Sequence, residues 1–373
     1  MLKKLLILIF ININLFAASH SFILENDALT GTDKHYTNGF FYTWMSDDND
    51  KDIPDWLNIE DIAVDNMAIS LSHLTFTPDD LSDPNVIIDD MPYAGYLNLN
   101  FFLYQSMSNY FHELGLGFGV VGPLARSEQI QNEIHRINGN RTPQGWDNQL
   151  KNDFLTNISY QFGYKTDKRD LGFIEYDWTN NVRVDLGEFY TGALVGTSIR
   201  FGSFVPNNFK TTGNFIGGEE SSLLNFGHKN GLDWSVSLGY FLNSIKRFYI
   251  VDEYEEYQLD HIHYTKGKVI TFNIYYDNFE FALKLRSTYV QSNDTVEGLE
   301  KDIEELDEES IKKWGGLTFR WKFDPENKKT PDTLEEKKIE KNENTYIEEI
   351  KEESKTLQKD AESSTILPQS QAQ

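Results

Sequence analysis

The most constraining feature of this sequence is an alternation of apolar and polar residues that recurs along most of its length. Between residues 95 and 104 the odd positions are apolar, and asparagines stand between them. The same pattern appears at 67–71, 157–164, 195–201, 236–240, 270–276 and 279–286. Because successive side chains of a strand point to opposite faces, each segment predicts a β-strand with one apolar and one polar face.

About twelve such segments can be counted between Ser21 and Phe323, and many begin or end on Tyr, Trp or Phe. Long strands with an apolar outward band and aromatic ends are typical of an outer-membrane barrel. A soluble sandwich also alternates, with its apolar faces turned inward. The strand lengths and aromatic ends favour an all-β fold, a transmembrane antiparallel β-barrel of about twelve strands.

The N-terminus indicates export. Lys3 and Lys4 precede an uncharged run over 5–16, which is followed by small residues. This order is typical of a secretory signal peptide, and the run is too short to span a bilayer. No later stretch is apolar for about eighteen residues, so no transmembrane helix is expected. We therefore predict a signal peptide over 1–18 and a Gram-negative outer-membrane barrel over 19–323.

The composition limits the classes of molecule that this protein can bind. The chain has no cysteine, so the exported fold does without disulfides, and its net charge is −25. We expect no nucleic-acid partner for so acidic a protein, because phosphate binding needs a basic face. From Asp324 the sequence turns to charged and small polar residues. Residues 324–373 are predicted to be a charged periplasmic tail, partly helical or disordered.

Strand counting brings four segments of the chain to the same rim. If both ends of the barrel lie in the periplasm, the outer rim receives Asn26 and Asp27, the segment 36–39, and the loops 77–92 and 122–151. The last of these contains a helix-like run over 124–137 that breaks at Gly139. Within it one helix face carries polar residues, namely Glu128, Gln131, Asn132 and His135.

These residue types suggest an ester hydrolase. His135 is the candidate base, because imidazole takes up a proton near neutral pH. Asp27, Asn26 and Thr37 offer oxygen ligands, which suit Ca²⁺ better than zinc. A bound calcium ion would polarise an ester carbonyl while His135 activates water. No Gly-x-Ser-x-Gly nucleophile motif is present. The same residue types also occur in plain turns, and surface histidines are often inert.

Four blocks of sequence resemble one known family. They are Asn26-Asp27, Tyr36-Thr37-Asn38-Gly39, Gly122-Pro123 with Gln131-Asn132 and His135-Arg136, and Gly145-Trp146-Asp147-Asn148-Gln149. Together they look like the LpxR family of lipid A deacylases. The resemblance implies a twelve-stranded outer-membrane barrel that removes the 3′-linked acyloxyacyl chain of lipid A in the outer leaflet, using calcium and a histidine base.

Carried over by position, the resemblance assigns roles to five residues. His135 would be the base, Asp27 and Asn26 would serve the calcium and the oxyanion, and Thr37 and Gln131 would line the same site; the metal ligands would be Asp27, Asn26 and Thr37. The chain departs from better-known members in two places. Where those members have an acidic residue shortly after the histidine, this chain has Asn140-Arg141, and Glu128 or Glu133 is a candidate substitute. Those members also carry a basic pair in the second outer loop, whereas the segment 77–93 has no Lys or Arg.

Two other functions are compatible with such a barrel. One is a non-catalytic outer-membrane protein, such as a porin or adhesin, and the other is an outer-membrane phospholipase. Under the deacylase hypothesis the expected partners are lipid A, as part of lipopolysaccharide, and the outer membrane. The barrel is expected to act as a monomer.

Overall fold

The computed structural model describes residues 18–26, 35–46, 64–214, 220–224, 226–227, 231–291 and 311–323. The chain divides into two units, Met1–Phe323 and Asp324–Gln373, and all described residues belong to the first. The predicted tail and most of the predicted signal peptide lie outside the described residues. Ala18, the last residue assigned to that signal, begins the first strand.

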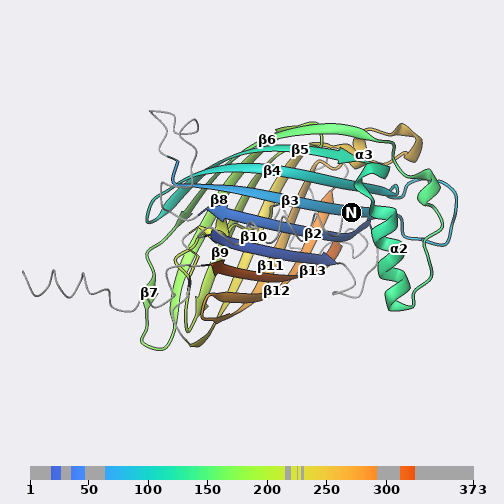
Figure 1. The fold of residues 1–373 in the computed structure, drawn as a ribbon. Coiled ribbons are helices and arrows are strands. Elements are labelled where there is room, and N and C mark those ends of the chain that lie inside the picture. The colour runs from blue at the N-terminus through green and yellow to red at the C-terminus, as the bar shows by residue number, and fades with distance from the viewer. Residues whose placement is uncertain are drawn as a thin grey trace, which may run out of the picture. The chain divides into compact units, whose positions relative to one another are not determined.

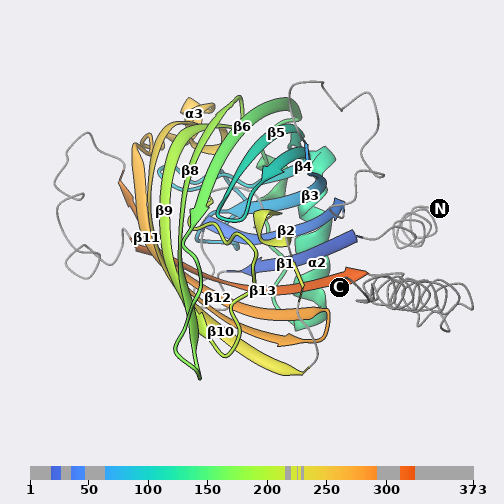
Figure 2. The ribbon, with the colours of Figure 1, turned by 90° about the vertical axis from the view of Figure 1, so that its left-hand side faces the viewer.

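Twelve long antiparallel strands form a closed barrel, which confirms the predicted fold class (Figures 1 and 2). They are β1 (Ala18–Asn26), β2 (His35–Ser46), β3 (Asn66–Thr77), β4 (Ala94–Ser106), β5 (Tyr110–Val121), β6 (Asp153–Lys165), β8 (Glu175–Gly187), β9 (Tyr190–Gly202), β10 (Leu232–Phe248), β11 (Tyr264–Tyr276), β12 (Phe279–Gln291) and β13 (Ile311–Phe323). A two-residue strand, β7 (Arg169–Asp170), pairs with β8. Neighbours in the chain pair throughout, and β1 closes on β13.

The alternation in the sequence sorts side chains between lipid and lumen. Outward residues such as Leu99, Leu116 and Phe272 stay exposed, as a membrane-facing band requires. Lumen residues are polar, and several of their charges are paired. The paired residues are Arg200 with Asp177 at 2.5 Å, Arg183 with Glu113 at 3.0 Å, and Arg320 with Glu280 at 2.7 Å. No helix in the described parts of the chain is long and apolar enough to cross a membrane.

The connection between β9 and β10 runs into the lumen, which the sequence pattern did not predict. Its described residues are bonded to several strands: Arg286 of β12 donates to the carbonyls of Gly213 and Asn214, and Asn181 of β8 donates to the carbonyl of Thr212. Figure 2 views the barrel from the end opposite α2, where this yellow-green segment lies within the ring of strands. It fills the lumen from that end.

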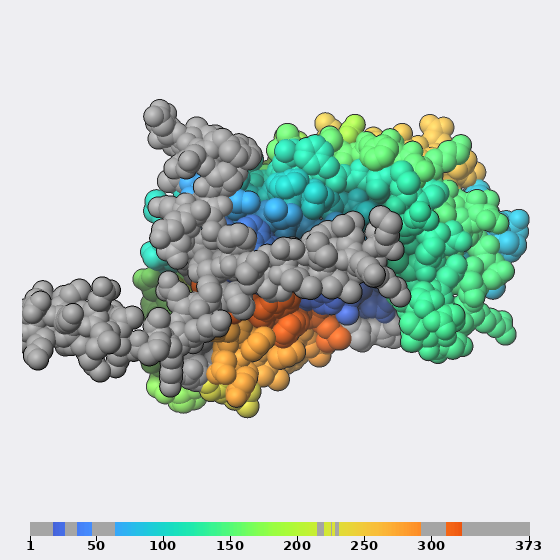
Figure 3. Space-filling model, viewed as in Figure 1, coloured from blue at the N-terminus to red at the C-terminus, as the bar shows by residue number. Residues whose placement is uncertain are grey.

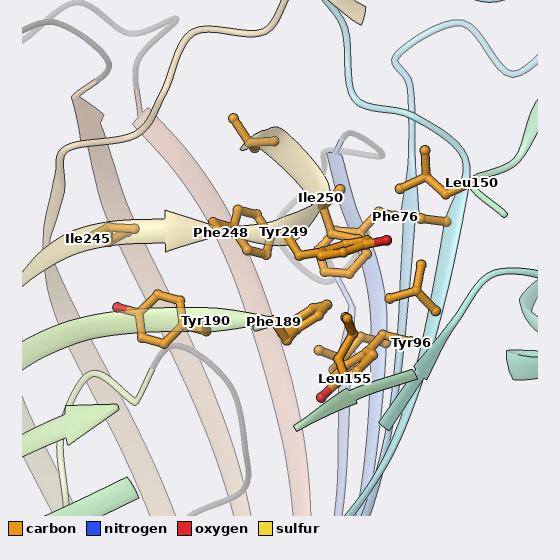
Figure 4. Packing of buried hydrophobic residues seen from close by; sticks show 14 of the residues in the cluster. Phe76, Tyr96, Leu150, Leu155, Phe189, Tyr190, Ile245, Phe248, Tyr249 and Ile250 are labelled. Carbon is orange, nitrogen blue, oxygen red and sulfur yellow. The ribbon is translucent and has the colours of Figure 1, made fainter. Parts of the chain in front are cut away.

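An apolar cluster fills the other end of the lumen (Figure 4). Tyr96 of β4 stacks on Phe189 with ring centroids 3.6 Å apart, and Phe248 of β10 packs against both Phe76 and Phe189. The short helix α3 (Tyr249–Asp252), which directly follows β10, adds Tyr249 and Ile250 to this cluster. In its described parts the lumen is therefore a packed interior, like that of other small barrels.

Candidate functional site

A helical segment follows β5 at the end of the barrel that the sequence predicts to be the outer rim. It consists of a 3₁₀ turn, η3 (Pro123–Ala125), and the helix α2 (Ser127–Asn138). The expected single helix over 124–137 is divided at Arg126, which has φ of 66°. The expected break at Gly139 is confirmed, because that residue ends α2 with φ of 73°. Figure 1 shows α2 running across the strand ends from β4 toward β1, and Figure 3 shows it as part of a continuous teal and green surface there.

Burial places α2 on the outside of the barrel wall. Along β3 the odd-numbered residues face outward, and Leu71 is 37% exposed. His73 and Thr75 continue that outward face but are buried, because η3 and α2 cover them. His73 Nε2 lies 3.0 Å from the carbonyl oxygen of Ala125, and Thr75 Oγ1 donates to Ser127 Oγ at 3.2 Å. The space between helix and wall therefore lies on the lipid side of the barrel, and not in its lumen.

A glycine allows this close approach. Gly95 of β4 faces outward beneath α2, and a Cβ atom there would come within 2.3 Å of Ser127 Oγ. Any side chain at this position would push the helix away from the wall.

The strand register places one residue from each of β1 to β4 in a row on the wall beneath the helix. Asn26 pairs with Asn38, Asn38 with Thr75, and Thr75 with Gly95, so these residues form one row across β1 to β4. Ser127 contacts the β3 and β4 end of this row.

The buried face of α2 consists of Ser127, Gln131 and His135, and is called the wall face below. Relative to Ser127, Gln131 lies about 6 Å and His135 about 12 Å farther along the axis, at a rise of about 1.5 Å per residue. Adjacent strands are about 4.8 Å apart. Because α2 runs from the β4 side toward β1 (Figure 1), Gln131 and then His135 lie successively nearer to β1, the strand that ends at Asn26.

A β-bulge turns the buried Thr37 toward the same side of the wall. Tyr36 pairs with Phe76 and Asn38 with Thr75, which leaves Thr37 as the extra residue. The Thr37 hydroxyl lies 2.6 Å from that of Thr77, and Asn26 Nδ2 donates to the Thr37 carbonyl at 3.0 Å. The bulge thus joins two of the predicted site residues, Asn26 and Thr37.

The residues on either side of the bulge explain the rest of the block 36–39. Tyr36 turns into the lumen and donates its hydroxyl to Glu25 at 3.1 Å. A Cβ atom at Gly39 would lie 1.8 Å from that hydroxyl. A side chain at position 39 would therefore displace the Tyr36 hydroxyl from its bond to Glu25.

The hydrogen bond of His135 defines its tautomer. Its Nδ1 lies 2.6 Å from the carbonyl oxygen of Arg141. Because a carbonyl only accepts, Nδ1 carries the proton, and in the neutral ring Nε2 keeps a lone pair. The backbone carbonyl of Arg141 thus orients the imidazole, a role for which the sequence suggested the carboxylate of Glu128 or Glu133. Glu133 does not, because it pairs with Arg136 on the exposed face of α2.

Gln131 is held by a residue to which the sequence assigned no role. Trp146 Nε1 donates to Gln131 Oε1 at 2.8 Å. An indole N–H only donates, so this bond fixes the amide orientation. Gln131 Nε2 is then a buried donor with no partner among the residues that the structure describes. Such a buried donor is available to an acceptor supplied by water or by a ligand.

Trp146 is itself fixed by the second outer loop. Its ring packs on Tyr93 with centroids 4.9 Å apart, and a Cβ atom at Gly145 would come within 2.3 Å of that tyrosine. Burial raises the pKa of Tyr93 to about 12, so the phenol stays neutral. The sequence signal was the block 145–149, which marked the segment without its partner.

The oxygen atoms near Asn26 fit calcium by type. The side chains of Asn26, Thr37 and Thr77 supply hard oxygen ligands, which Ca²⁺ prefers. Asp27, the predicted carboxylate ligand, lies outside the described residues. Over the described ranges, no three His, Cys, Asp or Glu side chains come together as a metal site.

Comparison with known proteins agrees with this architecture. The family model described as "Outer membrane protein LpxR" matches residues 5–323. The solved structure of LpxR from Salmonella typhimurium is similar with a TM-score of 0.63 and 16% identity, over 81% of this chain and 99% of that one. The β domain of the Bordetella autotransporter BrkA aligns over 82% of this chain and 98% of its own, with a TM-score of 0.38 and 7% identity. A comparison with curated proteins gave no match. The family resemblance seen in the sequence is thereby confirmed: this chain belongs to the LpxR family of outer-membrane proteins.

Proposed function

We propose that this protein is a lipid A deacylase, which hydrolyses the ester of the 3′-linked acyloxyacyl chain in the outer leaflet. The observation that carries the proposal is the buried His135, whose Nδ1 donates to a carbonyl and whose Nε2 is left to accept a proton on the lipid side of the wall. Membership of the LpxR family supports it. A base on the lipid side suits a substrate that reaches the enzyme from the membrane.

The chemistry is ester hydrolysis with His135 as general base. Nε2 takes a proton from water, and the water oxygen adds to the ester carbonyl carbon. The bond from that carbon to the sugar oxygen then breaks, and Nε2–H gives its proton to that oxygen, which yields a free fatty acid and a sugar hydroxyl. The Arg141 carbonyl stabilises the imidazolium through Nδ1–H. Gln131 Nε2, whose orientation is fixed by the Trp146 bond to Oε1, would donate to the oxyanion that develops.

We further propose that calcium binds at the end of β1. Asp27, Asn26 and Thr37 would hold the ion, supported by the oxygen chemistry of the described donors. When bound, it would polarise the ester carbonyl as a Lewis acid.

A serine-based phospholipase is the second candidate, because Ser127 Oγ lies 3.0 Å from His73 Nε2 at the same site. That nitrogen is also 3.0 Å from the Ala125 carbonyl, to which it can only donate. It therefore carries a proton and cannot take one from Ser127. The pair serves to hold η3 and α2 against the wall.

A porin is disfavoured by the lumen. The described residues of the β9–β10 connection and the apolar cluster around Phe189 occupy it from both ends. A protein that conducts ions would need an open path there.

The proposal is tested with purified protein and two substrates, lipid A and a glycerophospholipid, in detergent micelles. Mass spectrometry should show loss of the acyloxyacyl chain from lipid A and an intact phospholipid. Adding a chelator should stop the reaction, and calcium should restore it where zinc does not. Cleavage of the phospholipid alone would contradict the proposal, and undiminished deacylation in chelator would contradict the calcium site.

A further inference from the structure

One side of α2 is apolar and uncovered. Ile130, Ile134 and Ile137 are 39%, 40% and 68% exposed, although they belong to the helix that carries His135. They are called the isoleucine flank here. The remaining exposed face is polar, with Gln129 and Glu133.

Helix geometry sets the direction of this flank. At about 100° per residue, it lies roughly 90° to one side of the wall face, and Glu128 and Asn132 lie to the other side. The helix is right-handed and runs from the β4 side toward β1 across the strand ends (Figure 1). With the wall face against the strands, the isoleucine flank points along the outer surface of the barrel, toward the middle of the strands. Glu128 and Asn132 turn toward the outside.

The wall beside the flank is also apolar. Two residues inward from the row Asn26–Asn38–Thr75–Gly95, about 7 Å along the strands, lie Leu24 and Phe40. Leu24 is 45% exposed. Leu71 on β3, which is 37% exposed, extends this outer surface farther from the rim. The isoleucine flank is therefore continuous with the outward band of the barrel.

We propose that the isoleucine flank lies in the acyl-chain layer of the outer leaflet, so that α2 is a membrane-embedded interfacial helix. An amphipathic helix parallel to the membrane buries its apolar side at the boundary of head groups and acyl chains. This contact fixes the depth of the wall face, and with it the depth of His135, relative to the lipid esters. The membrane contact itself does not depend on hydrolysis.

The absence of cysteine makes a direct test possible, because one introduced cysteine carries a unique spin label. The labelled variants are Ile134→Cys on the flank, Glu133→Cys on the polar face, and Leu99→Cys on the outward band. In lipid vesicles, collision with oxygen reports an acyl-chain environment, and collision with a water-soluble nickel complex reports solvent. The label at 134 should favour oxygen, as the label at 99 does, and the label at 133 should favour nickel. A label at 134 as accessible to nickel as that at 133 would overturn the proposal.

A second variant tests the consequence for depth. Replacing Ile130 and Ile134 by serine should slow hydrolysis of lipid A in vesicles and leave it unchanged in detergent micelles, where no bilayer defines depth. Equal activity in both media would overturn the role in positioning. If the unaltered protein hydrolyses nothing in either medium, the deacylase proposal fails, while the labelling result still decides the membrane contact.

Discussion

Trp146→Phe isolates the contribution of one hydrogen bond to the site. The substitution removes the indole N–H that donates to Gln131 Oε1 at 2.8 Å and keeps an aromatic ring against Tyr93. Gln131 is 1% exposed, so water does not replace the lost donor. An unsatisfied buried acceptor costs about 1–3 kcal/mol. If that cost falls on the orientation of Nε2 in the transition state, kcat for lipid A hydrolysis drops by about 5-fold to 150-fold.

The assay is the initial rate of deacylation, with Trp234→Phe as the matched control. Trp234 is 43% exposed on the outward wall, so the same chemical change there should leave the rate unaltered. For each variant, a folded barrel is verified by its altered migration in gel electrophoresis when the detergent sample is left unheated. In a Gln131→Leu background, Trp146→Phe should add little, because both changes act through one bond. Fully additive losses would refute the reasoning.

Three further predictions follow from the packing. Gly122→Ala should lower the thermal midpoint more than Gly139→Ala, since both glycines have positive φ but only at 122 would a Cβ meet a neighbour, Lys151, at 2.6 Å. Arg200→Met should destabilise the barrel by about 3–5 kcal/mol in urea unfolding, because Asp177 is left buried and unpaired. Adding Asp177→Leu should recover most of that loss. No recovery would mean that the loss of this ion pair is not the cause. Purified protein in a planar bilayer should show no steady conductance, and well-defined open-channel steps would contradict the filled lumen.

Much of the fold could be predicted from the sequence because a strand's alternation is local. Each segment such as 95–104 reveals its two faces without knowledge of its neighbours, and strand counting then assigns a rim to each loop. The helix near His135 was found for the same reason. Its division at Arg126 was missed, since a left-handed residue other than glycine leaves no clear sequence signal.

Features that depend on contacts between distant segments could not be predicted. Strand counting brought Asn26, Thr37 and His135 to one rim, but only the burial of His73 and Thr75 shows that α2 covers the outside of the wall. The bulge at Thr37 depends on its register with β3, and the role of Trp146 depends on a bond across fifteen residues. The lumen segment after β9 has no periodicity that would reveal where it packs.

The measurement that tests the central claim most directly is the mass spectrum of lipid A from cells that produce this protein or its His135→Gln variant. Gln keeps a polar side chain of similar reach but has no basic nitrogen. The unaltered protein should yield lipid A lacking one acyloxyacyl chain, and equal amounts of folded variant should leave lipid A with all its chains. Lipid A that has lost that chain to the same extent in both strains would contradict the role of His135 as base.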